Sequence, residues 1–208
     1  MTPRIAILHG AGYGGGELVR LLLSHPAFDL VAATSRTFAG QPLSAAHPHL
    51  AGLSDLRFTD EAGFDASGVD AVFVAAEHGA SARAVAALDA AGYAGRIVDL
   101  SADFRFHDPA VYPAHFKFEH PCPDRLADFA YSIPEVHGDL PEGTRAVANP
   151  GCFATAITLS LWPFRQLGTP VDAYVTALTG ASGSGAKPSP TTHFPTRDGN
   201  VRAYKVLA

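Results

Sequence analysis

Cysteine is scarce in this chain, which holds two, Cys122 and Cys152. Two cysteines this far apart make no disulfide framework, and such usage is typical of a reducing compartment. Cys122 lies near His115 and His120, but no second pair of ligands accompanies them, so we expect no metal site. The sequence also lacks a signal-peptide pattern and any apolar run of membrane-spanning length. We therefore expect a cytoplasmic protein with no membrane partner.

Positive charge is in short supply as well. Lys and Arg number 15 against 20 Asp and Glu, which gives a formal net charge of -5. Without a basic excess, we expect no nucleic-acid partner. What the chain does have is 47% hydrophobic residues over 208 positions. This composition predicts a globular protein of one or two domains.

Glycines cluster directly after the first apolar run. Residues 4–8 read as a short strand, the glycines that follow have the spacing G-x-G-x-x-G, and residues 17–23 read as a helix. This order is typical of a dinucleotide-binding unit, in which glycines let the backbone approach a pyrophosphate and let the helix pack on the strand. The alternative is a flexible glycine turn without a ligand. The coenzyme-binding residues predicted here are Gly10, Gly12, Tyr13, Gly14 and Gly15.

The end of the second predicted strand favours a phosphorylated coenzyme. Residues 30–34 are apolar and are followed by Ser35 and Arg36. An NAD-specific site tends to carry Asp or Glu here to bind the ribose 2′-hydroxyl, whereas a hydroxyl and a guanidinium suit the 2′-phosphate of NADP. We therefore expect NADP as the cofactor, bound by Ser35 and Arg36. The alternative is a surface arginine with no ligand.

Further apolar runs predict the rest of a parallel sheet. Residues 70–76 and 96–100 resemble buried parallel strands, and residues 56–58 are a weaker candidate. A helix is expected over residues 81–91, and residues 130–135 look like an ordered segment that returns toward the sheet. The predicted fold class is therefore α/β, with a Rossmann-type parallel sheet.

Two residues at the tips of these strands are candidates for ligand binding, because strand tips face the crevice of such a sheet. His78 is expected to line the nicotinamide site, and Arg105 is expected to bind a substrate carboxylate or phosphate. The alternatives are a capping or solvent-facing His78, and an Arg105 held in a structural pair by Asp103.

The second cysteine stands between a strand and a helix. Residues 146–148 are apolar, Asn149-Pro150-Gly151 forms a sharp turn, and an apolar helix is expected over residues 153–161, with Pro163 bending or ending it. Cys152 is thereby placed at a helix N-terminus, where the helix dipole stabilises a thiolate and backbone donors can hold an oxyanion. Cys152 is thus a candidate nucleophile. The alternative is a small buried apolar residue.

The rest of the chain looks like the start of a second domain. Residues 171–179 alternate as a strand with one covered face. In the glycine-serine loop over residues 180–185, Ser182 and Gly183 are expected to contact the cofactor. A flexible loop that binds no ligand would account for this sequence equally well. The chain then stops at residues 204–208 with no cap, turn or polar tail. We therefore expect the chain to be truncated.

The chain resembles N-acetyl-gamma-glutamyl-phosphate reductase, and it is similar to the related reductase of lysine biosynthesis that acts on a carrier-bound aminoadipyl phosphate. The resemblance rests on motifs that occur in the right order over nearly the whole chain. They are Gly12-Tyr13-Gly14-Gly15-Gly16-Glu17-Leu18, Thr34-Ser35-Arg36, Asp99-Leu100-Ser101-Ala102-Asp103-Phe104-Arg105, Ile133-Pro134-Glu135 and Asn149-Pro150-Gly151-Cys152.

The resemblance implies an NADP-binding Rossmann domain over residues 1–149. It also implies the N-terminal part of an α+β catalytic domain over residues 150–208, of the glyceraldehyde-phosphate and aspartate-semialdehyde dehydrogenase kind. Cys152 would be the nucleophile, Arg105 and Asn149 would bind the substrate, and the full-length enzyme would be a homodimer or homotetramer. Two departures stand out. His9 occupies a place where the family usually has glycine, and the family's acid/base histidine falls beyond Ala208, so the fragment itself should be inactive.

The implied reaction is the NADPH-dependent reduction of an acyl phosphate to a semialdehyde and phosphate, through a thioester on Cys152. The motif Asn149-Pro150-Gly151 favours N-acetylglutamyl 5-phosphate, a substrate of arginine biosynthesis. One alternative is the carrier-bound aminoadipyl phosphate of lysine biosynthesis. The other is a non-catalytic NADP-binding module.

Overall fold

The computed structural model describes residues 1–203 of the chain. The chain forms two compact units, Met1–Val175 and Thr176–Ala208. The first contains the β-sheet and its helices. The described part of the second contains two short helical turns, Ala181–Ser184 and α5 (Phe194–Arg197).

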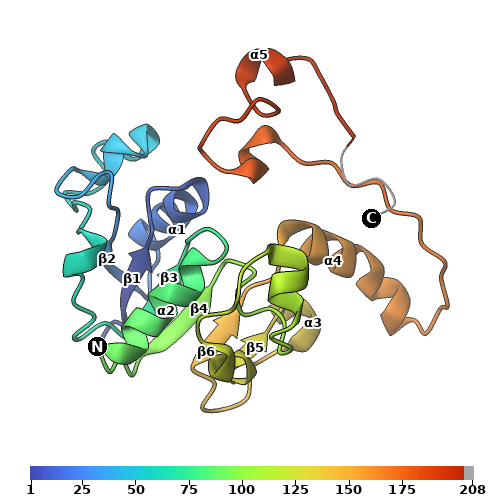
Figure 1. Ribbon diagram of the computed structural model, residues 1–208, viewed down its shortest axis with the longest axis horizontal. Coiled ribbons are helices and arrows are strands. Elements are labelled where there is room, and N and C mark those ends of the chain that lie inside the picture. The colour runs from blue at the N-terminus through green and yellow to red at the C-terminus, as the bar shows by residue number, and fades with distance from the viewer. Residues whose placement is uncertain (204–208) are drawn as a thin grey trace. The chain divides into compact units, whose positions relative to one another are not determined.

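A fully parallel six-stranded sheet forms the centre of the first unit (Figure 1). The spatial order is β2-β1-β3-β4-β6-β5. The chain passes from β1 to β2 on one side and then crosses to β3 on the other, so the strand order reverses between β1 and β3. Ligands of doubly wound sheets bind at such a point, beyond the carboxyl ends of the strands. The strands are β1 Arg4–Leu8, β2 Asp29–Ala33, β3 Ala71–Val74, β4 Arg96–Asp99, β5 Phe129–Tyr131 and β6 Ala146–Ala148.

Hydrophobic clusters cover both faces of this sheet. Ile5 and Ile7 of β1 belong to one cluster, which helix α1 (Tyr13–Leu23) completes with Val19 and Leu22. The alternate residues of β1, Ala6 and Leu8, belong to the other cluster, which includes Val85 and Leu88 of α2 (Ala80–Ala90). Burial on both faces explains why the strands are continuous apolar runs.

The connection from β2 to β3 contains only short 3-10 turns, at Leu43–Ala45, Pro48–Leu50 and Glu61–Gly63. The strand expected at residues 56–58 is wrong. Two isolated bridges take its place, Thr34 with Thr59 in parallel and Pro42 with Arg57 in antiparallel. Phe58 supplied the strand-like signal because it is buried, but it packs into the α1 cluster rather than forming part of a ladder.

The long connection from β4 to β6 packs around stacked aromatic rings. Phe104 and Phe129 stack with their centroids 3.8 Å apart, and the buried ring of Tyr112 lies 4.7 Å from that of His120. The segment expected to return to the sheet does so, because Phe129–Tyr131 pairs with β6 as an edge strand. The short helix α3 (Pro134–His137) follows it.

Helix α4 (Cys152–Gln166) begins one residue earlier and ends later than the sequence predicts. It continues past Pro163, whose carbonyl oxygen accepts the N–H of Leu167 at 3.0 Å, and Gly168 ends it with φ of 66°. The strand expected over residues 171–179 is wrong. These residues have no regular structure and are exposed, and they find no pairing strand among residues 1–203. None of the described helices is both long and apolar enough to span a membrane.

Candidate functional site

The turn after β1 is fastened to the end of β2 by Thr34. The His9 N–H donates to Thr34 Oγ1 at 3.0 Å, and the Gly10 N–H donates to the Thr34 carbonyl oxygen at 2.8 Å. The Thr34 side chain is fully buried, so this link is shielded from water. It holds Ser35 and Arg36 beside the glycine turn. Sequence reasoning did not single out Thr34, because a threonine at the end of a strand carries no distinctive signal.

Glycine is required where α1 meets this turn. A Cβ built on Gly15 would lie 2.5 Å from the carbonyl oxygen of Gly10, and one on Gly16 would lie 2.6 Å from the ring of His47. The buried His47 in turn bonds through Nε2 to the Gly10 carbonyl oxygen at 2.7 Å. The helix therefore packs directly on the backbone of the turn, as the predicted fingerprint requires.

The start of α1 suits a pyrophosphate. Gly12 is the N-cap residue and provides no side-chain cap, and a Cβ built on it would meet no heavy atom within 4 Å. Gly12 itself is half-buried, whereas Tyr13 and Gly14 are exposed. The first N–H groups of a helix have no acceptor inside it, and the dipole favours an anion there. The open space around the Cα of Gly12, next to such donors, fits the approach of the phosphates of a dinucleotide coenzyme.

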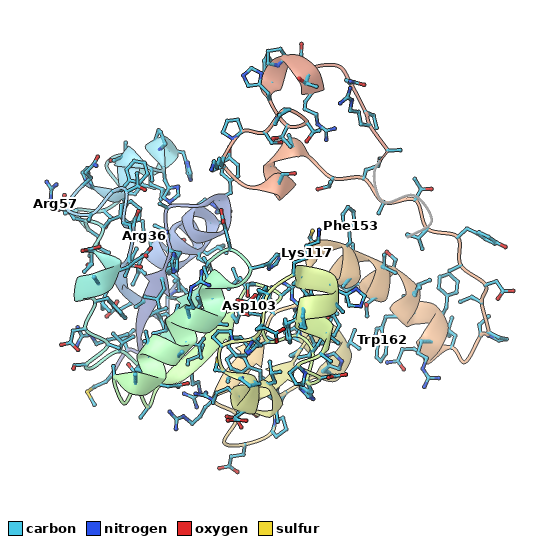
Figure 2. All side chains as sticks on the ribbon, in the orientation of Figure 1. Arg36, Arg57, Asp103, Lys117, Phe153 and Trp162 are labelled. Atoms are coloured by element: carbon cyan, nitrogen blue, oxygen red, sulfur yellow. The ribbon has the colours of Figure 1, made fainter. Side chains whose placement is uncertain are left out.

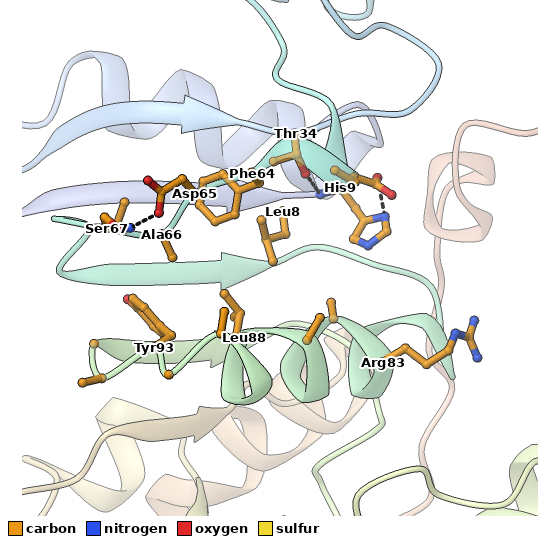
Figure 3. A pocket seen from close by; sticks show the side chains of 18 of the residues that line it. Leu8, His9, Thr34, Phe64, Asp65, Ala66, Ser67, Arg83, Leu88 and Tyr93 are labelled. Atoms are coloured by element: carbon orange, nitrogen blue, oxygen red, sulfur yellow. Dashed lines mark hydrogen bonds and ion pairs between the residues drawn. The ribbon is translucent and has the colours of Figure 1, made fainter.

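A cavity of about 600 Å³ adjoins the turn (Figure 3). It lies beside α2, and its lining includes Leu8, Thr34 and Arg36. Arg36, labelled in Figure 2, pairs through Nε with Glu61 Oε2 at 3.1 Å. Ser35 is buried instead, and its Oγ accepts the N–H of Phe38 at 3.2 Å. Of the two residues predicted to bind a 2′-phosphate, Arg36 lines the cavity, whereas the Ser35 side chain is buried in a turn.

His9 is unusual in conformation and in partner. Its φ is 57°, in the left-handed region that favours glycine, which fits the glycine usual in the resembling family. Its Nδ1 lies 2.9 Å from Glu61 Oε1. Burial lowers the pKa of His9 from its usual value, and the Glu61 carboxylate opposes that shift. Glu61 therefore joins His9 and Arg36, and sequence reasoning missed it because it comes from a distant turn.

At the ends of β3 and β4, Asp103 caps helix α2. Both carboxylate oxygens accept the N–H of Gly79 at 2.8 Å, and Oδ2 accepts the N–H of Ala82 at 2.9 Å. Asp103 is fully buried at the positive end of the helix, where a carboxylate is favoured. The carboxylate of Asp103 thus accepts backbone N–H groups of α2, whereas the alternative expectation was that it pairs with Arg105.

His78 is exposed just after the end of β3. This position is compatible both with a contact to nicotinamide and with a capping or solvent-facing role. Its Nδ1 accepts the N–H of Ala102 at 3.0 Å. That bond requires the ring proton to be on Nε2 when His78 is neutral. His78 can therefore offer an N–H to a ligand at this edge of the sheet, and its predicted contact with nicotinamide stays a prediction.

The turn before Cys152 is held by Arg105. The guanidinium donates from Nε to the Asn149 carbonyl oxygen at 2.8 Å and from Nη2 to the Leu100 carbonyl oxygen at 2.9 Å. The Asn149 N–H donates to the Asp99 carbonyl oxygen at 2.8 Å. Burial lowers the pKa of Arg105, and the charges of Asp99 and Cys152 are among those that oppose the shift. Arg105 therefore ties the end of β4 to the turn and brings positive charge close to the cysteine.

Cys152 is the first residue of α4 and is exposed, next to Phe153, which is labelled in Figure 2. Cys122 differs from it. Its half-buried Sγ donates to the Ala82 carbonyl oxygen at 3.6 Å, and burial raises the pKa of its thiol to about 11. The helix end and the exposure of Cys152 are those of a reactive thiol.

The structure brings most of the predicted site to one edge of the sheet. The glycine turn, Arg36, His78 and Cys152 all follow carboxyl ends of parallel strands in the first unit. Ser182 and Gly183 lie in a 3-10 turn of the second unit, and their contact with a coenzyme stays a prediction. Among residues 1–203, no group of His, Cys, Asp and Glu is arranged to hold a metal ion.

Family models match both parts of the chain. Residues 4–142 match the NAD-binding domain of semialdehyde dehydrogenase, and residues 152–208 match the dimerisation domain of the same family. The chain belongs to the semialdehyde dehydrogenase family. Its N-terminal part is accordingly an NAD(P)-binding domain of Rossmann type, which confirms the predicted fold class and the predicted class of cofactor.

Curated relatives include the [LysW]-L-2-aminoadipate 6-phosphate reductase of Deinococcus radiodurans. It is 39% identical over 203 residues, which are 97% of this chain and 57% of that protein. The [LysW]-L-2-aminoadipate/[LysW]-L-glutamate phosphate reductase of Saccharolobus solfataricus is 40% identical over 205 residues, 97% of this chain and 58% of that protein. This semialdehyde dehydrogenase chain therefore spans under two thirds of these relatives' length.

Solved structures share the fold at low identity. Aspartate semialdehyde dehydrogenase II of Vibrio cholerae superposes with a TM-score of 0.59 at 18% identity, over 89% of this chain and 49% of that one. The Candida albicans enzyme with NADP gives a TM-score of 0.57 at 16% identity, over 83% of this chain and 49% of that one. At these identities the likeness concerns the fold alone.

Proposed function

We propose that this chain carries the coenzyme domain and the catalytic cysteine of an NADPH-dependent reductase that converts an acyl phosphate to a semialdehyde and phosphate. The observation that carries the proposal is the exposed thiol of Cys152 at the start of α4, on the sheet edge that also bears the glycine turn. Nucleophile and coenzyme turn thus follow strands at the same edge of the sheet, which suits a two-stage reduction.

Cys152 performs the first stage. The Cys152 thiolate attacks the acyl carbonyl, and phosphate leaves, so that a thioester forms on Sγ. Cys152 is the first residue of α4, so its N–H has no acceptor within the helix, and we propose this N–H as a donor to the oxyanion. Removing a single such donor costs about 100-fold to 1,000-fold in rate in other enzymes.

The coenzyme, when bound, supplies the hydride that reduces the thioester. The residues that would hold it are those of the turn, with the pyrophosphate at the N-terminus of α1 and the 2′-phosphate near Arg36. Collapse of the resulting thiohemiacetal on Cys152 then releases the semialdehyde and restores the thiol.

Arg105 is proposed to serve the cysteine as well as the substrate. Its two carbonyl contacts hold the turn before Cys152 in place. Its positive charge, together with the N-terminus of α4, favours the departure of phosphate. Asn149 is exposed next to the same turn and is proposed to contact the substrate.

The relatives favour the lysine-type substrate over the acetylglutamyl one. Their names give LysW-linked aminoadipate or glutamate phosphates as substrates, so we propose a LysW-linked acyl phosphate as the substrate here and LysW as a partner protein. N-acetylglutamyl 5-phosphate, the substrate that the Asn149-Pro150-Gly151 motif favours, stays a prediction. The match of residues 152–208 to a dimerisation domain supports a homo-oligomer.

The reaction run in reverse tests this proposal. The full-length protein is supplied with NADP, phosphate and one semialdehyde at a time, either LysW-linked aminoadipate semialdehyde or N-acetylglutamate semialdehyde, and NADPH formation is followed by absorbance. We expect turnover with the LysW-linked compound, its loss in Cys152→Ser, and unchanged NADPH affinity in that variant. Turnover of the acetylated compound alone would favour the arginine-type enzyme, and turnover that survives in Cys152→Ser would remove the cysteine from the mechanism.

A further inference from the structure

One carboxylate contacts both His9 and Arg36 beside the glycine turn. Glu61 Oε1 lies 2.9 Å from His9 Nδ1, and Glu61 Oε2 lies 3.1 Å from Arg36 Nε. All three residues line the cavity that adjoins the turn. Arg83 of α2 lines it too, and Figure 3 labels Arg83 and His9. The charge presented to a ligand here depends on Glu61 as much as on Arg36.

Glu61 reaches this position through the bridge that replaces the expected strand. Thr59 pairs with Thr34 in parallel, and the Ser35 N–H donates to the Thr59 carbonyl oxygen at 3.0 Å. Two residues later the chain enters the turn Glu61–Gly63. An acidic side chain thereby stands beside the end of β2, which is where NAD-specific sheets carry their ribose-binding carboxylate.

The two members of the Arg36–Glu61 pair are not equally fixed. The Arg36 side chain is 80% exposed, whereas that of Glu61 is 21% exposed and also holds His9. An incoming 2′-phosphate can draw the guanidinium away, but the carboxylate stays nearby and repels a dianion. Arg36 alone would predict a strong preference for NADP, and Glu61 opposes that preference.

We propose that Glu61 is a determinant of coenzyme specificity, which neutralises Arg36 and narrows the preference of the site for NADP over NAD. The inference rests on the coenzyme site assigned under the proposed function. It concerns the adenosine ribose alone, so it is independent of the cysteine chemistry and of the acyl substrate.

Equilibrium binding tests the assignment without catalysis. NADPH and NADH are titrated separately into the protein and into Glu61→Gln, and binding is followed by nicotinamide fluorescence. Asp60→Asn is the matched control, since it removes the neighbouring exposed carboxylate, which forms no ion pair with Arg36 or His9 in the described structure. Glu61→Ala is a second variant, and circular dichroism checks that each variant is folded.

We expect Glu61→Gln and Glu61→Ala to tighten NADPH binding by about tenfold relative to NADH, with no such change in Asp60→Asn. A ratio of the two dissociation constants that stays within about twofold of the parent protein would overturn the role of Glu61 and leave the proposed function standing. Failure of the parent protein to bind either coenzyme would overturn the assigned site and, with it, the proposed function.

Discussion

Gly15 offers a sharp test of how the coenzyme turn is built. A Cβ at this position would lie 2.5 Å from the carbonyl oxygen of Gly10 and 2.6 Å from its carbonyl carbon and Cα, where real Cβ atoms are never found within 3.0 Å. The atoms it meets are backbone, and they are tied to Thr34 and His47 by hydrogen bonds. They cannot yield by a change of rotamer. Gly15→Ala must therefore separate α1 from the turn.

The neighbouring Gly14 provides the matched control. A Cβ there would meet its nearest heavy atom, Cδ2 of Leu100, at 3.9 Å, an ordinary contact distance. Overpacking costs about 1–3 kcal/mol, and the rigid backbone at Gly15 points to the upper end of that range. Alanine recovers up to about 1 kcal/mol of helix propensity at either position. We expect Gly15→Ala to lower the free energy of unfolding by about 2 kcal/mol and Gly14→Ala to leave it unchanged or slightly higher.

Urea denaturation followed by far-ultraviolet circular dichroism measures the difference. Gly15→Ala should shift the midpoint to lower urea at an unchanged m value, with a fall of about 4–8 °C in Tm. Its NADPH affinity should fall as well, since Gly10 and the start of α1 move apart. Equal stability of the Gly14 and Gly15 variants would contradict close helix–turn packing.

Two further predictions concern single side chains. Iodoacetamide at pH 8 should alkylate the exposed Cys152 at least about tenfold faster than Cys122, because burial raises the pKa of the Cys122 thiol to about 11. Peptide mass spectrometry measures both rates. Equal rates would contradict the structure around Cys122. His9→Gly should raise the free energy of unfolding by about 1 kcal/mol relative to His9→Ala, because alanine keeps the cost of a positive φ. Burial also lowers the pKa of His9 in the folded state, so the unfolded chain binds the proton more readily. The free energy of unfolding of the parent protein should therefore fall as the pH drops below about 6.5. The fall should be smaller in His9→Gly, which lacks the imidazole. An identical pH dependence in both would remove His9 as its source.

Local patterns in the sequence were sufficient for the parallel sheet and for the two turns of the site. Apolar runs predict β1, β3 and β4 because strands buried on both faces need no polar side chains. The spacing of Gly10, Gly12 and Gly15 predicts the glycine turn because backbone contact excludes any Cβ at Gly15, but α1 begins at Tyr13, before the expected start at Glu17. The helix after Asn149-Pro150-Gly151 is likewise predicted by local turn chemistry.

Contacts between distant segments were beyond such reasoning. Glu61 comes to Arg36 only through the bridge of Thr34 with Thr59, and Asp103 caps α2 across 21 to 24 positions of sequence. The strand predicted over residues 171–179 shows the opposite failure. An alternating pattern shows that one face can be covered, but a strand also needs a neighbour with which to pair, and residues 1–203 provide none.

The proposed function depends above all on acylation of the Cys152 thiol by an acyl phosphate. Intact-protein mass spectrometry can test it directly, with the protein mixed with the LysW-linked acyl phosphate in the absence of coenzyme and quenched in acid. We predict an added acyl mass that hydroxylamine removes, that maps to the peptide containing Cys152, and that is missing in Cys152→Ser. An adduct of the same mass on Cys152→Ser, or on the peptide containing Cys122, would contradict the assignment.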